Sequence, residues 1–222
     1  MIVDTSLQAR LRKAIRRWKV RRRQFEGGLE ILNELYEMPD PWRLSSDREQ
    51  ARFAATNRRI EEHLPEISSV LEIGCGEGLQ TRFLMDVAEE VTGLEGAARA
   101  IARARILLPS VDFIEADFDE DVPSLEGRRF SLVTMCEMLC YLKAPAAAVR
   151  RAQAHADLVL VTMYEPLARP LKPIFSGPQW SNLPPIVADG RTWLVHLWTH
   201  PPQQASPGTE GRLGHARRRR PF

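Results

Sequence analysis

The sequence predicts an α/β protein with a doubly wound, mostly parallel sheet and an antiparallel hairpin at its C-terminal end, and three observations support this prediction. From residue 68 onward, short apolar runs alternate with segments of helical periodicity, which is the order of parallel strands joined by right-handed crossovers. The first apolar run ends in three glycines at alternate positions, Gly74, Gly76 and Gly78. Near the C-terminus, an Asp-Gly pair separates two further apolar runs, as in a two-residue hairpin turn.

The N-terminal section is predicted to be a basic helical extension covering residues 1–38. Residues 10–23 contain nine Lys or Arg and no acid among apolar side chains at helical spacing. We therefore expect an amphipathic helix with its cations in solvent. The helical period continues over residues 25–36, and Pro39 ends it. RNA, an acidic membrane or an acidic protein surface could bind such a segment, although a solvated helix face is the commonest outcome for a run of charges.

One domain is predicted to follow, over residues 39–200, and it begins with a helix. Ser46 and Asp47 are residue types that cap helix N-termini. The charged segment after them is predicted to be helical through about His63, because Pro65 cannot continue a helix.

Five parallel strands are predicted next, each a short apolar run. They lie at residues 68–73, 91–95, 111–116, 130–136 and 157–163. The first two crossovers are predicted to be helices that end at about residue 89 and at Leu108. A further helix over about 144–156 precedes the last of these strands, whereas the acidic stretch 117–129 offers at most a short helix.

The segment after the fifth strand is predicted to lack a regular helix, because residues 165–185 contain six prolines. Residues 186–187 and 192–198 then form the predicted hairpin. The remaining residues, 201–222, are rich in Pro, Gln, Gly and Arg and are predicted to be a disordered basic tail.

Composition disfavours several classes of protein. The chain is 44% apolar and 27% charged, as a globular domain is, and no apolar run approaches the ~20 residues of a membrane span. The N-terminus lacks the apolar block of a secretory signal. Three cysteines without Cys-x-x-Cys spacing favour neither a disulfide framework nor a zinc site. These observations favour a protein of the reducing cytoplasm.

No metal site is predicted. His196 and His200 lie four residues apart, but a strand would separate them by about 13 Å at ~3.3 Å per residue. The Glu that follows the first His in zinc proteases is also missing here.

The glycine block predicts a loop that approaches a nucleotide-like ligand closely, because glycine has no Cβ and tolerates φ > 0. The dinucleotide fingerprint requires its third glycine at the position of Leu79. The acid Glu72, just before the block, would repel a pyrophosphate. A cationic nucleoside therefore fits these residues better than NAD does.

Acidic residues recur where the next two strands end. Glu95 ends the second strand, where a carboxylate can accept hydrogen bonds from both ribose hydroxyls, and Asp117 follows the third. Ligands of open α/β sheets bind at the carboxyl ends of the strands, so we expect these acids to face one ligand. With their neighbours they form the predicted ligand site, which comprises Glu72, Gly74, Cys75, Gly76, Glu95, Gly96, Asp117, Phe118 and Cys136.

The acid-x-Gly-x-Gly-x-Gly pattern of residues 72–78 resembles motif I of the class I S-adenosylmethionine-dependent methyltransferases. The resemblance implies a Rossmann-like methyltransferase sheet with S-adenosyl-L-methionine as the cofactor. It also implies that Asp117 receives the adenine amino group and that Phe118 lines the ring.

Two further stretches narrow the resemblance. Residues 40–44, Asp-Pro-Trp-Arg-Leu, and residues 137–142, Glu-Met-Leu-Cys-Tyr-Leu, are similar to elements of the nodulation N-methyltransferases of the NodS type. By that resemblance, Trp42 and Arg43 close over the cofactor.

Methyl transfer is predicted to take place after the fourth strand, where Glu137 and Tyr141 lie. An amine must be neutral to attack, and its product is cationic. Glu137 is therefore predicted to orient the amine, take its proton through water and stabilise the developing charge. Tyr141 is predicted to line the same pocket. In the alternative interpretation, Glu137 only binds the cofactor or caps the next helix, and Tyr141 packs in the core.

The predicted function is methyl transfer to a small molecule, most directly to an amine of a sugar or natural product. Base-methylating enzymes carry Asn or Asp followed by Pro-Pro and an aromatic residue after the fourth strand, and this chain does not, so a nucleic-acid substrate is disfavoured. The family's chito-oligosaccharide acceptor is not carried over, because the segment after residue 165 is shortened and proline-rich. An O-methyltransferase and a methyltransferase-like binding or regulatory protein remain alternatives, and no oligomeric state is predicted.

Overall fold

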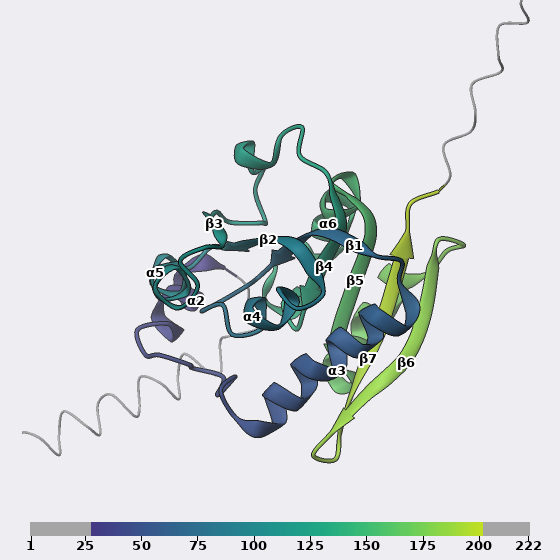
Figure 1. The fold of residues 1–222 in the computed structure, drawn as a ribbon, viewed down its shortest axis with the longest axis horizontal. Helices are drawn as coiled ribbons and strands as arrows, with labels where there is room; N and C mark the ends of the chain where they lie inside the picture. Colours follow the sequence, from purple (N-terminus) through teal and green to yellow (C-terminus); the bar gives the residue numbers. More distant parts are fainter. Residues whose placement is uncertain (1–27, 202–222) are drawn as a thin grey trace, which may run out of the picture.

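A computed structural model describes residues 28–201, and Figure 1 shows their central sheet with helices on both sides. The seven strands lie in the order β3-β2-β1-β4-β5-β7-β6. Their bounds are β1 Ile67–Ile73, β2 Ala88–Glu95, β3 Asp112–Glu115, β4 Phe130–Cys136, β5 Ala156–Tyr164, β6 Trp180–Ala188 and β7 Arg191–Thr199. Strands β1 to β5 pair in parallel, whereas β7 runs antiparallel to β5 and to β6. The predicted doubly wound sheet with an antiparallel hairpin is therefore confirmed.

Helices and helical turns connect these strands. The α-helices are α2 Leu29–Leu35, α3 Asp47–His63, α4 Thr81–Leu84, α5 Ala98–Leu107, α6 Pro145–Ala154 and α7 Glu165–Ala168. The 3-10 turns are η1 Pro123–Leu125, η2 Leu139–Tyr141 and η3 Arg169–Phe175. The predicted basic helix at 10–23 and the tail beyond residue 201 lie outside the described residues. Within residues 28–201, no helix combines the length and the apolar character that crossing a membrane requires.

Two hydrophobic layers cover the two faces of the sheet. On β4, Leu132 packs in the layer that contains residues of α3 and α4, whereas Val133 and Met135 pack in the layer that contains residues of α6. Because both faces are covered, the central strands need apolar residues at consecutive positions, and this explains their near-continuous apolar runs. Figure 1 shows α3 lying across the part of the sheet formed by β7 and β6.

The predicted helix from the glycine block to residue 89 is wrong. The structure has only the short helix α4, and β2 already begins at Ala88. Ala88 and Glu90 pair with Ile67 and Ser69 of β1. Pairing with an existing parallel strand satisfies the backbone of this segment, so the tertiary context overrides its local helix propensity.

The hairpin is longer than predicted. Strand β6 starts at Trp180 and continues through Pro184 and Pro185, with an irregular register between Leu183 and Ile186. Prolines lack the N–H that a ladder needs, and they are tolerated here because β6 is an edge strand. The guanidinium of Arg59 on α3 donates hydrogen bonds to the carbonyl oxygens of both prolines, at 2.8 and 3.3 Å. The region before β6 also contains the short turns α7 and η3, where no regular helix was predicted.

Candidate active site

A cavity of about 320 Å³ lies at the carboxyl ends of the parallel strands. Most of the predicted site residues line it, namely Trp42, Glu72, Gly74, Cys75, Glu95, Gly96, Asp117, Phe118, Cys136, Glu137 and Tyr141. Arg43 and Gly76 do not contribute to the lining. Arg43 is exposed with φ of 59°. Gly76 contributes indirectly, because its N–H donates a hydrogen bond to Glu95, which lines the cavity.

The glycine loop after β1 is held against the end of β2. The backbone N–H groups of Gly74 and Cys75 donate hydrogen bonds to the carbonyl oxygen of Leu94, at 2.8 and 3.0 Å. Gly74 has φ of +77°, and a Cβ there would come within 2.8 Å of the Met138 Cβ. Only glycine combines this backbone conformation with such a close approach. We call this part of the cavity, with the ends of β1, β2 and β3, the loop side.

Glu95 is the carboxylate that organises the loop side. Its two carboxylate oxygens accept hydrogen bonds from the N–H of Gly76, at 3.2 Å, and of Ala97, at 2.9 Å. Burial raises the pKa of Glu95, and these backbone N–H groups oppose that effect. The acid therefore fixes the shape of the loop while it borders the cavity.

Glu72 is a second buried carboxylate on the loop side. It is 2% exposed, and the hydroxyl of Thr81 donates a hydrogen bond to it. Burial raises the pKa of Glu72 to about 7, although the Thr81 hydroxyl and the Arg52 guanidinium counteract this. The charge of Glu72 therefore lacks full compensation within the protein.

The end of β3 completes the loop side. Asp117 Oδ1 accepts a hydrogen bond from the N–H of Asp119 at 2.9 Å, which fixes the turn after the strand. The neighbouring Phe118 is buried, with the Arg151 guanidinium 5.4 Å from its ring centre. An acid and an aromatic ring thus border the cavity at adjacent positions.

The segment before α3 covers the cavity. The ring of Trp42 lies 5.1 Å from that of Tyr36 and 5.6 Å from that of Tyr141, centre to centre. Glu77 of the glycine loop accepts a hydrogen bond from the Asp40 N–H at 2.9 Å and forms an ion pair with Arg103 of α5. We call α2 and the following residues through Trp42 the cover. Its residues Leu29, Leu32 and Tyr36 were not predicted to belong to the site, although they line the cavity.

Glu137 lies directly after β4 in a strained backbone conformation, with φ of 58°. Its Oε1 accepts a hydrogen bond from the Tyr164 N–H at 2.7 Å, which fixes the side chain against the end of β5. Burial raises the pKa of Glu137 to about 7. Arg52, the Tyr164 N–H and Trp193 lower this pKa, whereas Glu49 raises it. The carboxylate is therefore poised to change its protonation state near neutral pH.

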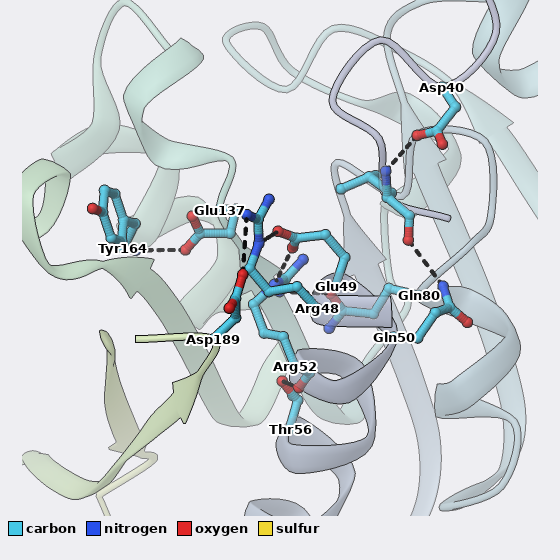
Figure 2. Close-up of polar contacts among 11 residues, drawn as sticks. Asp40, Arg48, Glu49, Gln50, Arg52, Thr56, Gln80, Glu137, Tyr164 and Asp189 are labelled. Atoms are coloured by element: carbon cyan, nitrogen blue, oxygen red, sulfur yellow. Dashed lines mark hydrogen bonds and ion pairs between the residues drawn. The ribbon is translucent and has the colours of Figure 1, made fainter. Parts of the chain in front are cut away.

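Several polar residues on the opposite side of the cavity were not predicted. They are Arg48, Glu49 and Arg52 of α3, Gln80 after the glycine loop, Tyr164 at the end of β5 and Arg191 of β7, and Trp193 lies beside them. Figure 2 shows that Glu137 faces this group, which we call the α3 side of the cavity. Charged residues of a helix are normally in solvent, and the position of α3 over the sheet brings these inward.

The absence of a metal site stays a prediction. The structure shows what the two histidines contact. His196 stacks on Phe175 with ring centres 4.0 Å apart, and its Nδ1 lies 2.7 Å from Asn182 Oδ1. The three cysteines are free thiols. Within the described part of the chain, no group of three or more His, Cys, Asp or Glu could hold a metal ion.

Comparisons with known proteins agree with this geometry. Residues 70–157 match the model of a family described as a methyltransferase domain. The chain is 38% identical over 123 residues to the dTDP-3-amino-3,6-dideoxy-alpha-D-glucopyranose N,N-dimethyltransferase of Streptomyces fradiae, covering 54% of this chain and 46% of that protein. It is 27% identical over 118 residues to nodulation protein S of Bradyrhizobium diazoefficiens, covering 51% of this chain and 54% of that protein. The chain thus spans about half the length of the curated relatives it matches.

A solved structure shares the fold. It is the N-methyltransferase NodS from Bradyrhizobium japonicum WM9 in complex with S-adenosyl-L-homocysteine, which aligns with a TM-score of 0.61 at 19% identity. The alignment covers 77% of this chain and 97% of that chain. The matched methyltransferase domain and the relatives confirm the predicted resemblance to the class I S-adenosylmethionine-dependent methyltransferases of the NodS type, and the solved structure shows that the fold is shared.

Proposed function

We propose that this chain transfers a methyl group from S-adenosylmethionine to an amine of a small molecule such as a sugar or natural product. The observation that carries the proposal is the pair of buried carboxylates, Glu72 and Glu95, that border the cavity beside the glycine loop. Within residues 28–201, neither carboxylate has a salt-bridge partner. A cationic ligand would supply the missing positive charge, whereas a pyrophosphate would be repelled.

The described residues fit this cofactor. The oxygens of Glu95 accept hydrogen bonds from backbone N–H groups and border the cavity, where carboxylate lone pairs could also accept from a ribose hydroxyl. At Gly96, a Cβ would come within 2.6 Å of the Leu29 Cδ1, so the backbone there lies directly under the cover. Asp117 and Phe118 would hold the adenine amino group and ring, and Trp42 would close over the cofactor. These assignments rest on the lining of one cavity by all of these residues.

The remaining residues would orient and deprotonate the acceptor. When bound, the cofactor supplies an activated methyl group on a sulfonium. Glu137 would bind the amine and take its proton, because its pKa of about 7 suits a general base near neutral pH. Tyr141 would contact the acceptor from η2. Holding the acceptor in line with the methyl group can supply much of the rate acceleration, since well-oriented intramolecular reactions reach effective molarities of ~10⁵ to 10⁸ M.

The carboxylate of Glu137 also favours nitrogen over oxygen as the acceptor atom. Positive charge develops on a nitrogen nucleophile during methyl transfer, and a carboxylate such as Glu137 would stabilise it. The thiol of Cys136 lines the same cavity, and burial raises its pKa to about 11. The thiol therefore stays protonated and would not compete for the methyl group. The curated relative from Streptomyces fradiae is named as an N,N-dimethyltransferase of an amino sugar.

The proposal is tested with purified protein, S-adenosylmethionine and a panel of acceptors in matched pairs that carry either an amino or a hydroxyl group at the same carbon of a hexose. We expect release of S-adenosylhomocysteine with amino sugars and not with their hydroxyl partners. Release with the hydroxyl partners would assign the chain to O-methylation instead. Cofactor binding in calorimetry without release from any acceptor would favour a binding or regulatory protein.

The location of the protein is a further part of this proposal. The three cysteines are unpaired, and free thiols are typical of a reducing compartment. We therefore propose that the chain acts in the cytoplasm. Because the base-methylation motif is missing after β4, we further propose a soluble small molecule as the acceptor and not nucleic acid.

A further inference from the structure

Arg52 is a buried arginine on the α3 side of the cavity. It is 2% exposed. Its Nε donates a hydrogen bond to Glu49 Oε2 at 2.8 Å, and its terminal NH1 donates one to Gln80 Oε1 at 3.2 Å. The guanidinium also lies 4.6 Å from the ring centre of Phe53 and 5.9 Å from that of Trp193. A buried charge held by so many partners has a fixed position and a strong field.

Glu49 shares its charge between two arginines. Besides Arg52, it accepts a hydrogen bond from Arg48 Nε at 3.0 Å, and Arg48 also lies 4.0 Å from Asp189 at the turn of the β6–β7 hairpin. Figure 2 shows this chain of charged side chains running from α3 toward Glu137 and the hairpin. Glu49 is therefore well compensated, and part of the positive charge of Arg52 remains available to other groups.

We propose that Glu49 and Arg52 of α3 act as a positioning pair for Glu137: Arg52 holds the Glu137 carboxylate ionised in the cavity, and Glu49 limits how much of that positive charge Glu137 receives. This inference rests on the proposed function, because it assigns the pair to the acceptor side of that same site. Neither residue needs to touch the acceptor, since both act through the electric field at Glu137.

Charged and titratable groups from several elements share this cavity with Glu137 or interact with groups that do. They are Arg48, Glu49 and Arg52 of α3, Glu72 of β1, Cys136 of β4, Cys140 and Tyr141 of η2, Tyr164 of β5 and Arg191 of β7, with Asp189 reached through Arg48. Among them, Arg52 lowers the pKa of Glu137 and Glu49 raises it. The two members of the pair thus act on the same carboxylate in opposite directions.

The test uses this opposition. Removing the charge of Arg52 with Arg52→Gln should raise the pKa of Glu137 by about one unit, and Glu49→Gln should lower it by a similar amount. Arg52→Lys keeps the charge and should restore a titration near that of the unchanged protein. Arg58→Gln is the matched control, because Arg58 is an exposed arginine of the same helix.

The measurement is the pH titration of the Glu137 carboxyl carbon by NMR in protein labelled with ¹³C-glutamate, where Glu137→Gln identifies the signal by its disappearance. Opposite shifts in the Arg52→Gln and Glu49→Gln proteins support the pair. An unmoved Glu137 titration in both proteins, or shifts in the same direction, would overturn it. If Arg52→Gln does not fold, Glu49→Gln is compared with the unchanged protein alone. A lower pKa of Glu137 in Glu49→Gln then supports the proposal, and an equal or higher pKa overturns it.

A second measurement connects the pair to turnover. With an acceptor from the panel above, the acidic limb of kcat/KM against pH should move to higher pH in Arg52→Gln and to lower pH in Glu49→Gln. A purely structural role would lower activity and leave the limb in place, which would contradict the proposal. The NMR titration needs no acceptor, so a failure of methyl transfer and a failure of this inference give different results.

Discussion

Among single residues, Glu137 has the most direct consequence for chemistry. It combines a position at the end of β4, a fixed hydrogen bond to the Tyr164 N–H and a pKa of about 7. Replacing it with Gln should reduce kcat by roughly 10²- to 10⁴-fold, the usual contribution of a general base. The dissociation constant for S-adenosylmethionine should change little, because Glu137 faces the α3 side of the cavity and the proposed cofactor residues lie on the loop side.

The pH dependence of this residue has a definite sign. The carboxylate must be ionised to accept a proton, so activity should fall as the pH drops below about 7, the pKa of Glu137 without ligands. A bound cation would lower that pKa and move the limb to lower pH. Unchanged turnover in Glu137→Gln, measured as S-adenosylhomocysteine release with cofactor affinity followed in parallel, would remove the catalytic role.

Individual residues also show which parts of the site the sequence can predict. Glu95 and Asp117 were predicted because they directly follow apolar runs, and the ends of parallel strands must meet at one edge of the sheet. Arg52 was not predicted, because a charged residue in a charged helix is normally in solvent. Its burial depends on how α3 lies over the sheet, and no local pattern in the sequence records that arrangement.

At the scale of elements, the cover makes a specific prediction at the glycine loop. Gly76 has φ of +56°, and a Cβ there would come within 2.7 Å of the Tyr36 hydroxyl oxygen. Gly190, in the hairpin turn, has φ of +66° and nothing within 4 Å. Alanine at either position pays for left-handed backbone, about 1 kcal/mol or more. Only Gly76→Ala should also displace the cover.

The two glycine variants are therefore a matched pair. We expect both to lose stability in urea unfolding, with the larger loss in Gly76→Ala because of its clash with Tyr36. Gly76→Ala alone should weaken S-adenosylmethionine binding, by tenfold or more if the displaced contacts are worth about 1.4 kcal/mol. Equal cofactor affinity in the two variants would show that the cover does not contribute to binding.

The elements themselves were predictable to different degrees. Strand β4 follows an apolar run and helix α3 follows residue types that favour helix N-termini, and both were predicted. The segment after the glycine block has helical propensity, yet β2 extends into it because β1 offers a pairing partner. Strand β6 contains two prolines, which argue against a strand locally, and it exists because β7 and Arg59 hold it in place.

For the whole molecule, the buried Glu72 ties stability to pH. Its pKa is raised from 4.5 to about 7 in the folded protein, so the folded protein holds a proton that the unfolded chain releases between these values. The contribution of this bound proton to the free energy of unfolding is fully present below about pH 4.5 and is lost as the pH rises through about 7. The shift corresponds to roughly 3 kcal/mol at 1.36 kcal/mol per unit.

We expect Glu72→Gln to flatten the fall in unfolding free energy between pH 5 and 7.5 in the cofactor-free protein. Glu61→Gln, at an exposed position of α3, serves as the control. Urea titrations at a series of pH values give the comparison. A curve for Glu72→Gln parallel to that of the unchanged protein would show that Glu72 is not protonated in the folded state.

The cavity as a whole is assembled from three stretches of the chain, namely the matched central part and the residues before and after it. Glycine loop, β2 and β3 lie within residues 70–157, the part that matches the methyltransferase domain family. The charged residues of α3 and the residues Tyr164 and Trp193 lie outside that part and meet it only in the folded protein. If the proposed function is correct, substitutions at residues 48–52 would change the protonation of Glu137, whereas the carboxylates Glu72 and Glu95 beside the glycine loop come from the matched central part and would stay in place.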